Sequence, residues 1–138
     1  AVMGMYDAMY RMFFEKDDNH GSLVLRLVSG ETSILLTGDI GTIDETILLQ
    51  QGVDIKSNIL KAAHHGSKYS STEKFLQAVQ PEIAILSYGA NNFYGHPHPE
   101  TIERLQNKNV ILYETAKQGT ITVVIGKDSY TIEGMYAE

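Results

Sequence analysis

The sequence contains no cysteine and no tryptophan, and only three of its 138 residues are proline. Without cysteine the chain has no disulfide scaffold, no thiolate-ligated zinc site and no thiol nucleophile. Any metal ion must therefore bind to histidine, aspartate or glutamate side chains.

Positive charge is also scarce. The chain has 11 Lys and Arg against 17 Asp and Glu, a net charge of -6, which excludes nucleic-acid binding through a broad basic surface. A metal-assisted attack on an acidic polymer remains compatible with this charge. No run of apolar residues approaches the ~18 to 20 that a membrane-spanning helix needs, so we expect no membrane segment in this chain.

The length predicts one domain, and the apolar patterns predict an α/β layered fold. The spacings Thr42-x-x-Glu45 and Ser70-x-x-Glu73 are those of capping boxes, each at the start of a helix. The predicted strands are residues 22–28, 33–37, 59–63, 83–87, 110–113, 120–125 and 130–134, and the predicted helices are residues 3–14 and those that follow Thr42, Ser70 and Pro99.

Polar residues that could bind a metal or take part in catalysis directly follow several of these strands. Asp39 comes after the apolar run 34–37 and behind Gly38, which lets the backbone turn so that the carboxylate crosses the sheet edge. The alternative is an ordinary turn or helix N-cap aspartate.

The pair His64 and His65 ends the next predicted strand. In an extended backbone neighbouring side chains face opposite sides, so we expect one ring to be a metal ligand and the other a neighbour. Backbone N–H groups of Gly66 and Ser67 could meet an anion at the start of the following helix. The alternative is a capped loop with an incidental histidine pair.

The segment Gly95-His96-Pro97-His98-Pro99 holds two imidazoles on a stiff backbone. The alternative is a rigid turn in which His98 caps the next helix. Four of the five histidines thus lie in two short loops and Asp39 lies in a third, which favours a histidine and carboxylate metal site over a Ser-His-Asp triad. We expect Asp39, His65 and His96 to meet at one sheet edge.

Four blocks of sequence, in this order and spacing, carry a specific resemblance. They are Asn19-His20-Gly21-Ser22-Leu23-Val24, Leu35-Leu36-Thr37-Gly38-Asp39, Leu60-Lys61-Ala62-Ala63-His64-His65-Gly66-Ser67 and Tyr94-Gly95-His96-Pro97. Over about residues 19–122 the chain resembles the C-terminal half of the metallo-β-lactamase-like domain of ComEC-type competence proteins.

The resemblance implies half of an αβ/βα sandwich, with a mixed sheet flanked by helices and a site for zinc or manganese at its edge. Asp39 matches the family's metal-bridging aspartate, and His65 its late-motif histidine ligand, with His64 as the alternative. His96 resembles a substrate or phosphate contact. Asn19 falls where other members carry a metal-binding histidine.

The superfamily's signature His-x-His-x-Asp-His, or its His-x-Asp-x-Asp-His form, occurs nowhere in the 138 residues. We therefore interpret residues 1–18 as an N-terminal helix or arm, and residues 19–138 as the C-terminal portion of the domain, inactive in isolation. The resemblance implies a parent that is a bacterial membrane protein. It further implies that in this parent the domain lies on the extracytoplasmic side and hydrolyses single-stranded DNA, or another phosphodiester, during uptake.

Two alternatives stay open: a non-catalytic structural or interaction domain of a transport protein, and a small-molecule metallo-hydrolase of the same fold. We also expect a homodimer or other self-association. Half of the sandwich would leave the apolar faces of strands 22–28, 33–37 and 59–63 partly bare, and residues 3–14 offer a movable cover.

Overall fold

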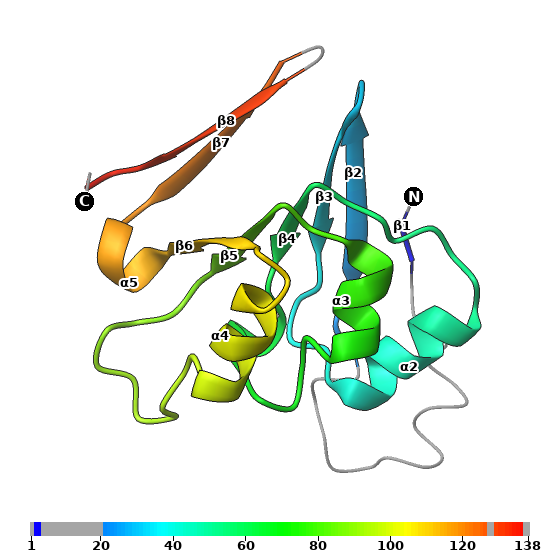
Figure 1. Ribbon diagram of the computed structural model, residues 1–138, viewed down its shortest axis with the longest axis horizontal. Helices are drawn as coiled ribbons and strands as arrows, with labels where there is room; N and C mark the ends of the chain where they lie inside the picture. The colour runs from blue at the N-terminus through cyan, green and yellow to red at the C-terminus, as the bar shows by residue number, and fades with distance from the viewer. Residues whose placement is uncertain (1, 4–20, 127–128, 137–138) are drawn as a thin grey trace.

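A six-stranded mixed sheet organises the computed structural model, which describes residues 2–3, 21–126 and 129–136 (Figure 1). Spatial order follows chain order from β1 to β6; pairing is antiparallel from β1 to β3 and parallel from β3 to β6. The strands are β1 (Val2–Met3), β2 (Val24–Ser29), β3 (Thr32–Leu36), β4 (Ile59–Lys61), β5 (Ile83–Leu86) and β6 (Ile111–Glu114).

One face of the sheet is covered by helices α2 (Thr42–Gln50), α3 (Glu73–Val79) and α4 (Pro99–Gln106). Leu35, Leu60 and Ala84 are paired neighbours on this face and are fully buried in one apolar core. No helix in the described ranges is long and apolar enough to cross a membrane.

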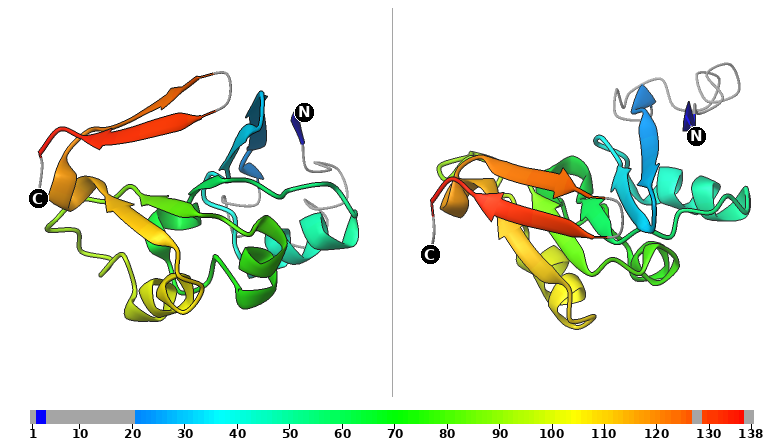
Figure 2. Two further views of the ribbon diagram at one scale, coloured as in Figure 1. Left: turned by 45° about the horizontal axis from the view of Figure 1, so that its top comes forward. Right: turned by 90° about the horizontal axis from the view of Figure 1, so that it is seen from above.

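The other face lies beneath a separate antiparallel hairpin, β7 (Ile121–Ile125) and β8 (Tyr130–Gly134), which the short helix α5 (Thr115–Gln118) joins to β6 (Figure 2). The Tyr130 hydroxyl donates to a Glu82 carboxylate oxygen at 2.8 Å, which fixes the hairpin to the start of β5.

A row of five aliphatic side chains crosses this second face. Its paired members are Leu27, Ile34, Ile59, Ile83 and Ile111. The ends of the row are exposed, at 51% for Leu27 and 59% for Ile111, whereas Ile59 in the middle is fully buried. The expectation that the apolar face of strand 59–63 is left partly bare is therefore wrong, and the exposed apolar surface lies at the two ends of the row, in β2 and β6.

The α/β class and the mixed sheet flanked by helices are confirmed, and the predicted order of strands and longer helices from residue 22 onward matches the structure. The sequence pattern missed α5 and a 3-10 turn, η2 (Ala63–Gly66). The predicted helix at residues 3–14 and the arm at residues 1–18 lie outside the described residues, apart from Val2–Met3 in β1.

Both predicted capping boxes are wrong in detail. The N–H of Gly41, the N-cap of α2, donates to Asp44 at 2.9 Å. Glu45 is instead fully buried and accepts the N–H groups of Ser71 and Thr72. Thr72 is the N-cap of α3, two residues later than predicted. Glu45 thus joins α2 to the start of the next helix rather than capping its own.

Candidate metal site

Two backbone hydrogen bonds join the three loops that follow the parallel strands β3, β4 and β5. The N–H of His64 donates to the carbonyl oxygen of Gly38 at 3.1 Å, and the N–H of His98 donates to that of Gly66 at 3.0 Å. Because parallel strands end at the same edge of a sheet, these bonds bring the loop side chains together at the carboxyl ends of the strands.

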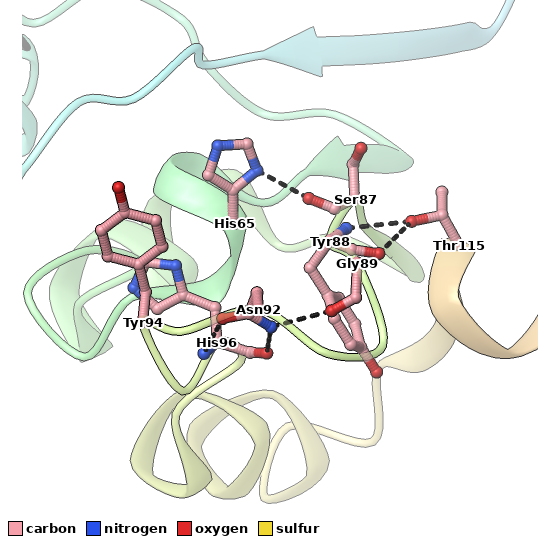
Figure 3. A pocket seen from close by; sticks show the side chains of 8 residues that line it. All are labelled: His65, Ser87, Tyr88, Gly89, Asn92, Tyr94, His96 and Thr115. Atoms are coloured by element: carbon pink, nitrogen blue, oxygen red, sulfur yellow. Dashed lines mark hydrogen bonds between the residues drawn. The ribbon is translucent and has the colours of Figure 1, made fainter.

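Asp39 and His65 form a close pair of potential ligands at this edge. Asp39 Oδ1 lies 3.9 Å from His65 Nε2, and both side chains are about half exposed. The other ring nitrogen, His65 Nδ1, lies 2.7 Å from the carbonyl oxygen of Ser87 (Figure 3). A proton on Nδ1 donated to this carbonyl leaves the Nε2 lone pair directed toward Asp39, which is the usual arrangement of metal-ligating histidines.

The histidine pair has an unusual backbone. His64 (φ 48°) and His65 (φ 56°) are both left-handed within η2, a conformation that residues other than glycine rarely adopt. The expectation that the two rings face opposite sides is wrong, because it assumed an extended backbone. Both rings approach His96, with centroid separations of 5.5 Å for His64 and 6.2 Å for His65.

His96 is held by the side chain of Asn92. The backbone N–H of His96 donates to Asn92 Oδ1 at 2.9 Å, and Asn92 Nδ2 donates back to the carbonyl oxygen of His96 at 2.6 Å (Figure 3). Asn92 Nδ2 also donates to the carbonyl oxygen of Gly89 at 2.9 Å. One amide thus closes the loop and fixes where the His96 ring can lie.

The surroundings of His96 favour its neutral form. Burial lowers the pKa of its ring below the ordinary value, and the neighbouring imidazoles of His98, His64 and His65 lower it further. The charge of Asp39 acts in the opposite direction. A neutral imidazole offers one N–H donor and one lone pair, so His96 can either donate to a phosphate oxygen or accept a proton.

Gly66 is tightly surrounded at the site, and the Ser67 N–H is already used within the histidine turn. A Cβ on Gly66 would lie 2.7 Å from Pro97 Cβ and 2.9 Å from Leu86 Cδ2, and its φ of +83° favours glycine. Ser67 is buried, and its N–H donates to the carbonyl oxygen of His64 at 2.9 Å. The geometry therefore does not support the expected contact between the Ser67 amide and a substrate anion.

Lys61 is a residue that sequence reasoning missed. It ends β4, is partly buried, and its Nζ donates to the carbonyl oxygen of Ala62 at 2.9 Å. Burial lowers the pKa of Lys61, and the charge of Asp39 opposes that shift. A lysine at the end of an apolar strand just before a histidine pair was the available signal.

A cavity of about 380 Å³ adjoins the histidines (Figure 3). Its far wall is fixed by two hydrogen bonds: the N–H of Tyr88 donates to Thr115 Oγ1 at 2.9 Å, and the Thr115 hydroxyl donates to the Tyr88 carbonyl oxygen at 3.0 Å. The lining residues are His65, Ser87, Tyr88, Gly89, Asn92, Tyr94, His96 and Thr115. The candidate ligands therefore stand beside a space of ligand size.

The expectation that Asp39, His65 and His96 meet at one sheet edge is confirmed by these separations. Asp39 is not a helix N-cap, because Gly41 has that position. His98 is the N-cap of α4 by backbone, but its Nδ1 accepts the N–H of Lys68 rather than capping the helix.

Within residues 2–3, 21–126 and 129–136, no group of three or more histidine, aspartate or glutamate side chains is arranged to hold a metal ion. Asp39 and His65 fit a metal as two donors of a larger set, since an oxygen and a nitrogen ligand face each other across an open gap. Asn19 lies outside the described residues.

Residues 12–90 match the family model described as the metallo-beta-lactamase superfamily. The chain is 42% identical over 103 residues to ComE operon protein 3 of Bacillus subtilis (strain 168) and 38% identical over 112 residues to competence protein ComA of Neisseria gonorrhoeae. It is 35% identical over 116 residues to recombination protein 2 of Haemophilus influenzae. These matches cover 75%, 80% and 84% of this chain but only 13%, 16% and 14% of the respective relatives.

Proposed function

Because the chain belongs to the metallo-beta-lactamase superfamily, we propose that it supplies part of the metal site of a phosphodiesterase domain that acts on DNA during uptake. Residues 19–138 are the C-terminal portion of that domain and residues 1–18 an arm. The similarity to competence protein ComA supports this role. In the parent protein the domain lies on the extracytoplasmic side of a bacterial membrane.

The relationship between Asp39 and His65 carries the proposal. The Ser87 carbonyl selects the tautomer of His65 whose Nε2 faces the Asp39 carboxylate, so both donors are directed at one position before any metal arrives. We assign both residues as ligands of zinc or manganese. His64, whose ring also adjoins His96, is the alternative histidine ligand.

A bound divalent metal supplies a water of lowered pKa and stabilises charge on a phosphate. The chain's own groups position the substrate. His96, kept neutral and fixed by Asn92, donates a ring N–H to a phosphate oxygen. Gly66 leaves room for Pro97 and Leu86 at the floor of the site. Asn19 stays a proposed substrate contact.

Two donors are fewer than the three or four that hold zinc in proteins. The chain alone therefore binds metal weakly and hydrolyses DNA slowly or not at all. A structural domain of a transport protein and a small-molecule hydrolase are the alternatives, and they differ in what the site binds. A structural domain needs no metal at Asp39, whereas a small-molecule hydrolase binds metal there without contacting DNA.

The test is a manganese titration of the full chain, followed by the loss of the free-ion electron paramagnetic resonance signal. We expect Asp39→Asn and His65→Ala each to weaken manganese binding ~10-fold or more, by analogy with the effect of disturbing metal-site ligands and their partners. The matched control is Asp54→Asn, an exposed carboxylate that pairs with Arg26. Equal affinities in the chain and all three variants would contradict the proposal and favour the structural alternative.

A further inference from the structure

Three aromatic side chains project into solvent from the loops that carry the candidate metal site. Phe93 is fully exposed, Tyr94 is 79% exposed and Tyr69 is 68% exposed. Single exposed apolar residues are common, but a group of them beside a cavity marks a binding surface.

One of these rings, that of Tyr94, packs against the histidine cluster, and Phe93 precedes it in the same loop. The ring of Tyr94 stacks on that of His96 at a centroid distance of 5.8 Å and an angle of 19°. The His96 ring in turn stacks on that of His65 at 6.2 Å and 26°. Figure 3 shows Tyr94 over His96 at the mouth of the cavity. A row of nearly parallel rings thus leads from solvent to a candidate metal ligand.

Tyr69 belongs to another loop, whose backbone is bonded to the histidine cluster. His98, whose ring is 5.0 Å from that of His96, accepts the N–H of Lys68. Tyr69 follows Lys68, and its carbonyl oxygen accepts the N–H of Thr42, close behind Asp39. Lys68 Nζ lies 5.3 Å from the centre of the Tyr69 ring, so a cation accompanies this aromatic face.

The loop that presents Phe93 and Tyr94 is already ordered. Asn92 bonds to Gly89 before these residues and to His96 after them. A loop backbone held in place loses little conformational freedom when a ligand binds to it, so more of the contact energy becomes affinity.

We propose that Tyr94 and Phe93, together with Tyr69 of the neighbouring loop, form an aromatic platform that stacks against unpaired nucleobases next to the phosphate at the candidate metal site. This subsite rests on the proposed function. Aromatic stacking is tolerant of sequence, because every base has a π face. It is also the interaction left to a chain whose net charge of -6 cannot hold a backbone by broad attraction. Paired bases hide their faces inside the duplex, so the platform selects single strands.

Because the chain has no tryptophan, the variant Phe93→Trp carries one reporter at the platform. The probe is an oligothymidine of about 12 nucleotides, a length that one small single-strand-binding domain can occupy. The titration is made in EDTA, so that neither metal binding nor hydrolysis contributes. The matched control is Val124→Trp, which replaces a residue of β7 that is 57% exposed.

We expect the oligothymidine to quench Phe93→Trp fluorescence about twofold and to leave Val124→Trp unchanged, as stacking on the platform requires. Adding Tyr94→Ala to Phe93→Trp should weaken binding about fivefold or more, and adding Tyr94→Phe should not. An abasic oligomer with the same phosphates should not quench.

Three results would overturn the stacking subsite: no quenching, quenching by the abasic oligomer as strong as by oligothymidine, or equal quenching by a hairpin duplex. None of them depends on Asp39 or His65. If oligothymidine quenches Phe93→Trp but manganese affinity does not depend on Asp39 or His65, the proposed phosphodiesterase is refuted. The aromatic residues then form a single-strand-binding surface without a metal site.

Discussion

The N–H of His64 donates to the carbonyl oxygen of Gly38 at 3.1 Å, and this bond fixes the histidine turn against the residue that precedes Asp39. The Asp39 N–H is held in turn by the Ser22 hydroxyl at 3.1 Å. Gly38 has a φ of +56°, and a Cβ there would lie 3.0 Å from Ser22 Cβ. The backbone from which the Asp39 carboxylate projects is therefore fixed by contacts on both sides.

The isolated chain should hydrolyse DNA poorly, because Asp39 and His65 alone are too few ligands for a tightly held metal. The measurement is release of product from single-stranded DNA and from bis(p-nitrophenyl) phosphate with manganese or zinc, at rates near the metal-only background. Robust turnover that Asp39→Ala abolishes would show that this chain contains a complete catalytic site.

Replacing Gly66 by alanine should destabilise the fold. Its φ of +83° is unfavourable for alanine, and the new Cβ would overlap Pro97 and Leu86, so we expect a loss of about 2–4 kcal/mol in the free energy of unfolding. Gly52→Ala is the matched control, since Gly52 has a φ of +65° with nothing within 4 Å; backbone strain alone should lower its stability by about 1–2 kcal/mol. Urea denaturation measures both, and equal losses would mean that the close contacts at Gly66 relax freely.

Glu45 should make stability depend on pH. Burial raises its pKa above the ordinary 4.5, although hydrogen bonds from Thr72 and Ser71 and the charge of Arg104 oppose the shift. Folding therefore favours the protonated carboxyl. Its stabilising contribution is fully present below pH 4.5 and is lost as the pH rises through the folded-state pKa.

Urea denaturation of the chain and of Glu45→Gln across this range should show the two unfolding free energies converging or crossing as the pH rises. Glu31→Gln, at an exposed turn, should have the same pH dependence of the unfolding free energy as the unsubstituted chain. A pH-independent difference in unfolding free energy between the unsubstituted chain and Glu45→Gln would contradict the raised pKa.

We further propose that the chain self-associates through the face that bears the aliphatic row, because Leu27 is 51% exposed at one margin of it. Light scattering at micromolar concentration should give a mass near twice 15.3 kDa. Leu27→Glu should shift the mass toward that of the monomer. Val124→Glu, which also replaces an exposed aliphatic residue by a charged one but lies on β7, should not. A monomeric mass for the unsubstituted chain would contradict this proposal.

The sequence predicts the sheet well because its strands are short apolar runs bounded by turn residues, and it predicts that Asp39 and the histidine loops share an edge because parallel strands end together. It does not predict the left-handed turn at His64 and His65, since that conformation is imposed by contacts with other loops rather than by residue type. A glycine at these positions would have predicted a left-handed turn, because glycine adopts positive φ readily, whereas histidine does not.

The errors at Asp44 and Glu45 have a similar origin. Either carboxylate can cap the helix from its position in the sequence. Asp44 does so because Glu45 accepts the N–H groups of Ser71 and Thr72, which are distant in the sequence. Asn92 was missed because its two bonds to His96 depend on the path of the loop between them. Pairings of this kind leave no periodicity in the sequence.

The sequential order of the sheet, β1 through β6, also bears on how the protein emerges during synthesis. Each strand pairs with the one made just before it, so a growing chain can add β4 to β3 and then β5 to β4 without waiting for a distant partner. Asp39 is synthesised early, directly after β3. His96 and Asn92, whose side chain bonds to the His96 backbone, are synthesised only after β5. Strands β1 to β5 are thus made before His96, whereas β6 follows it, so most of the sheet can pair before the last loop of the site is synthesised.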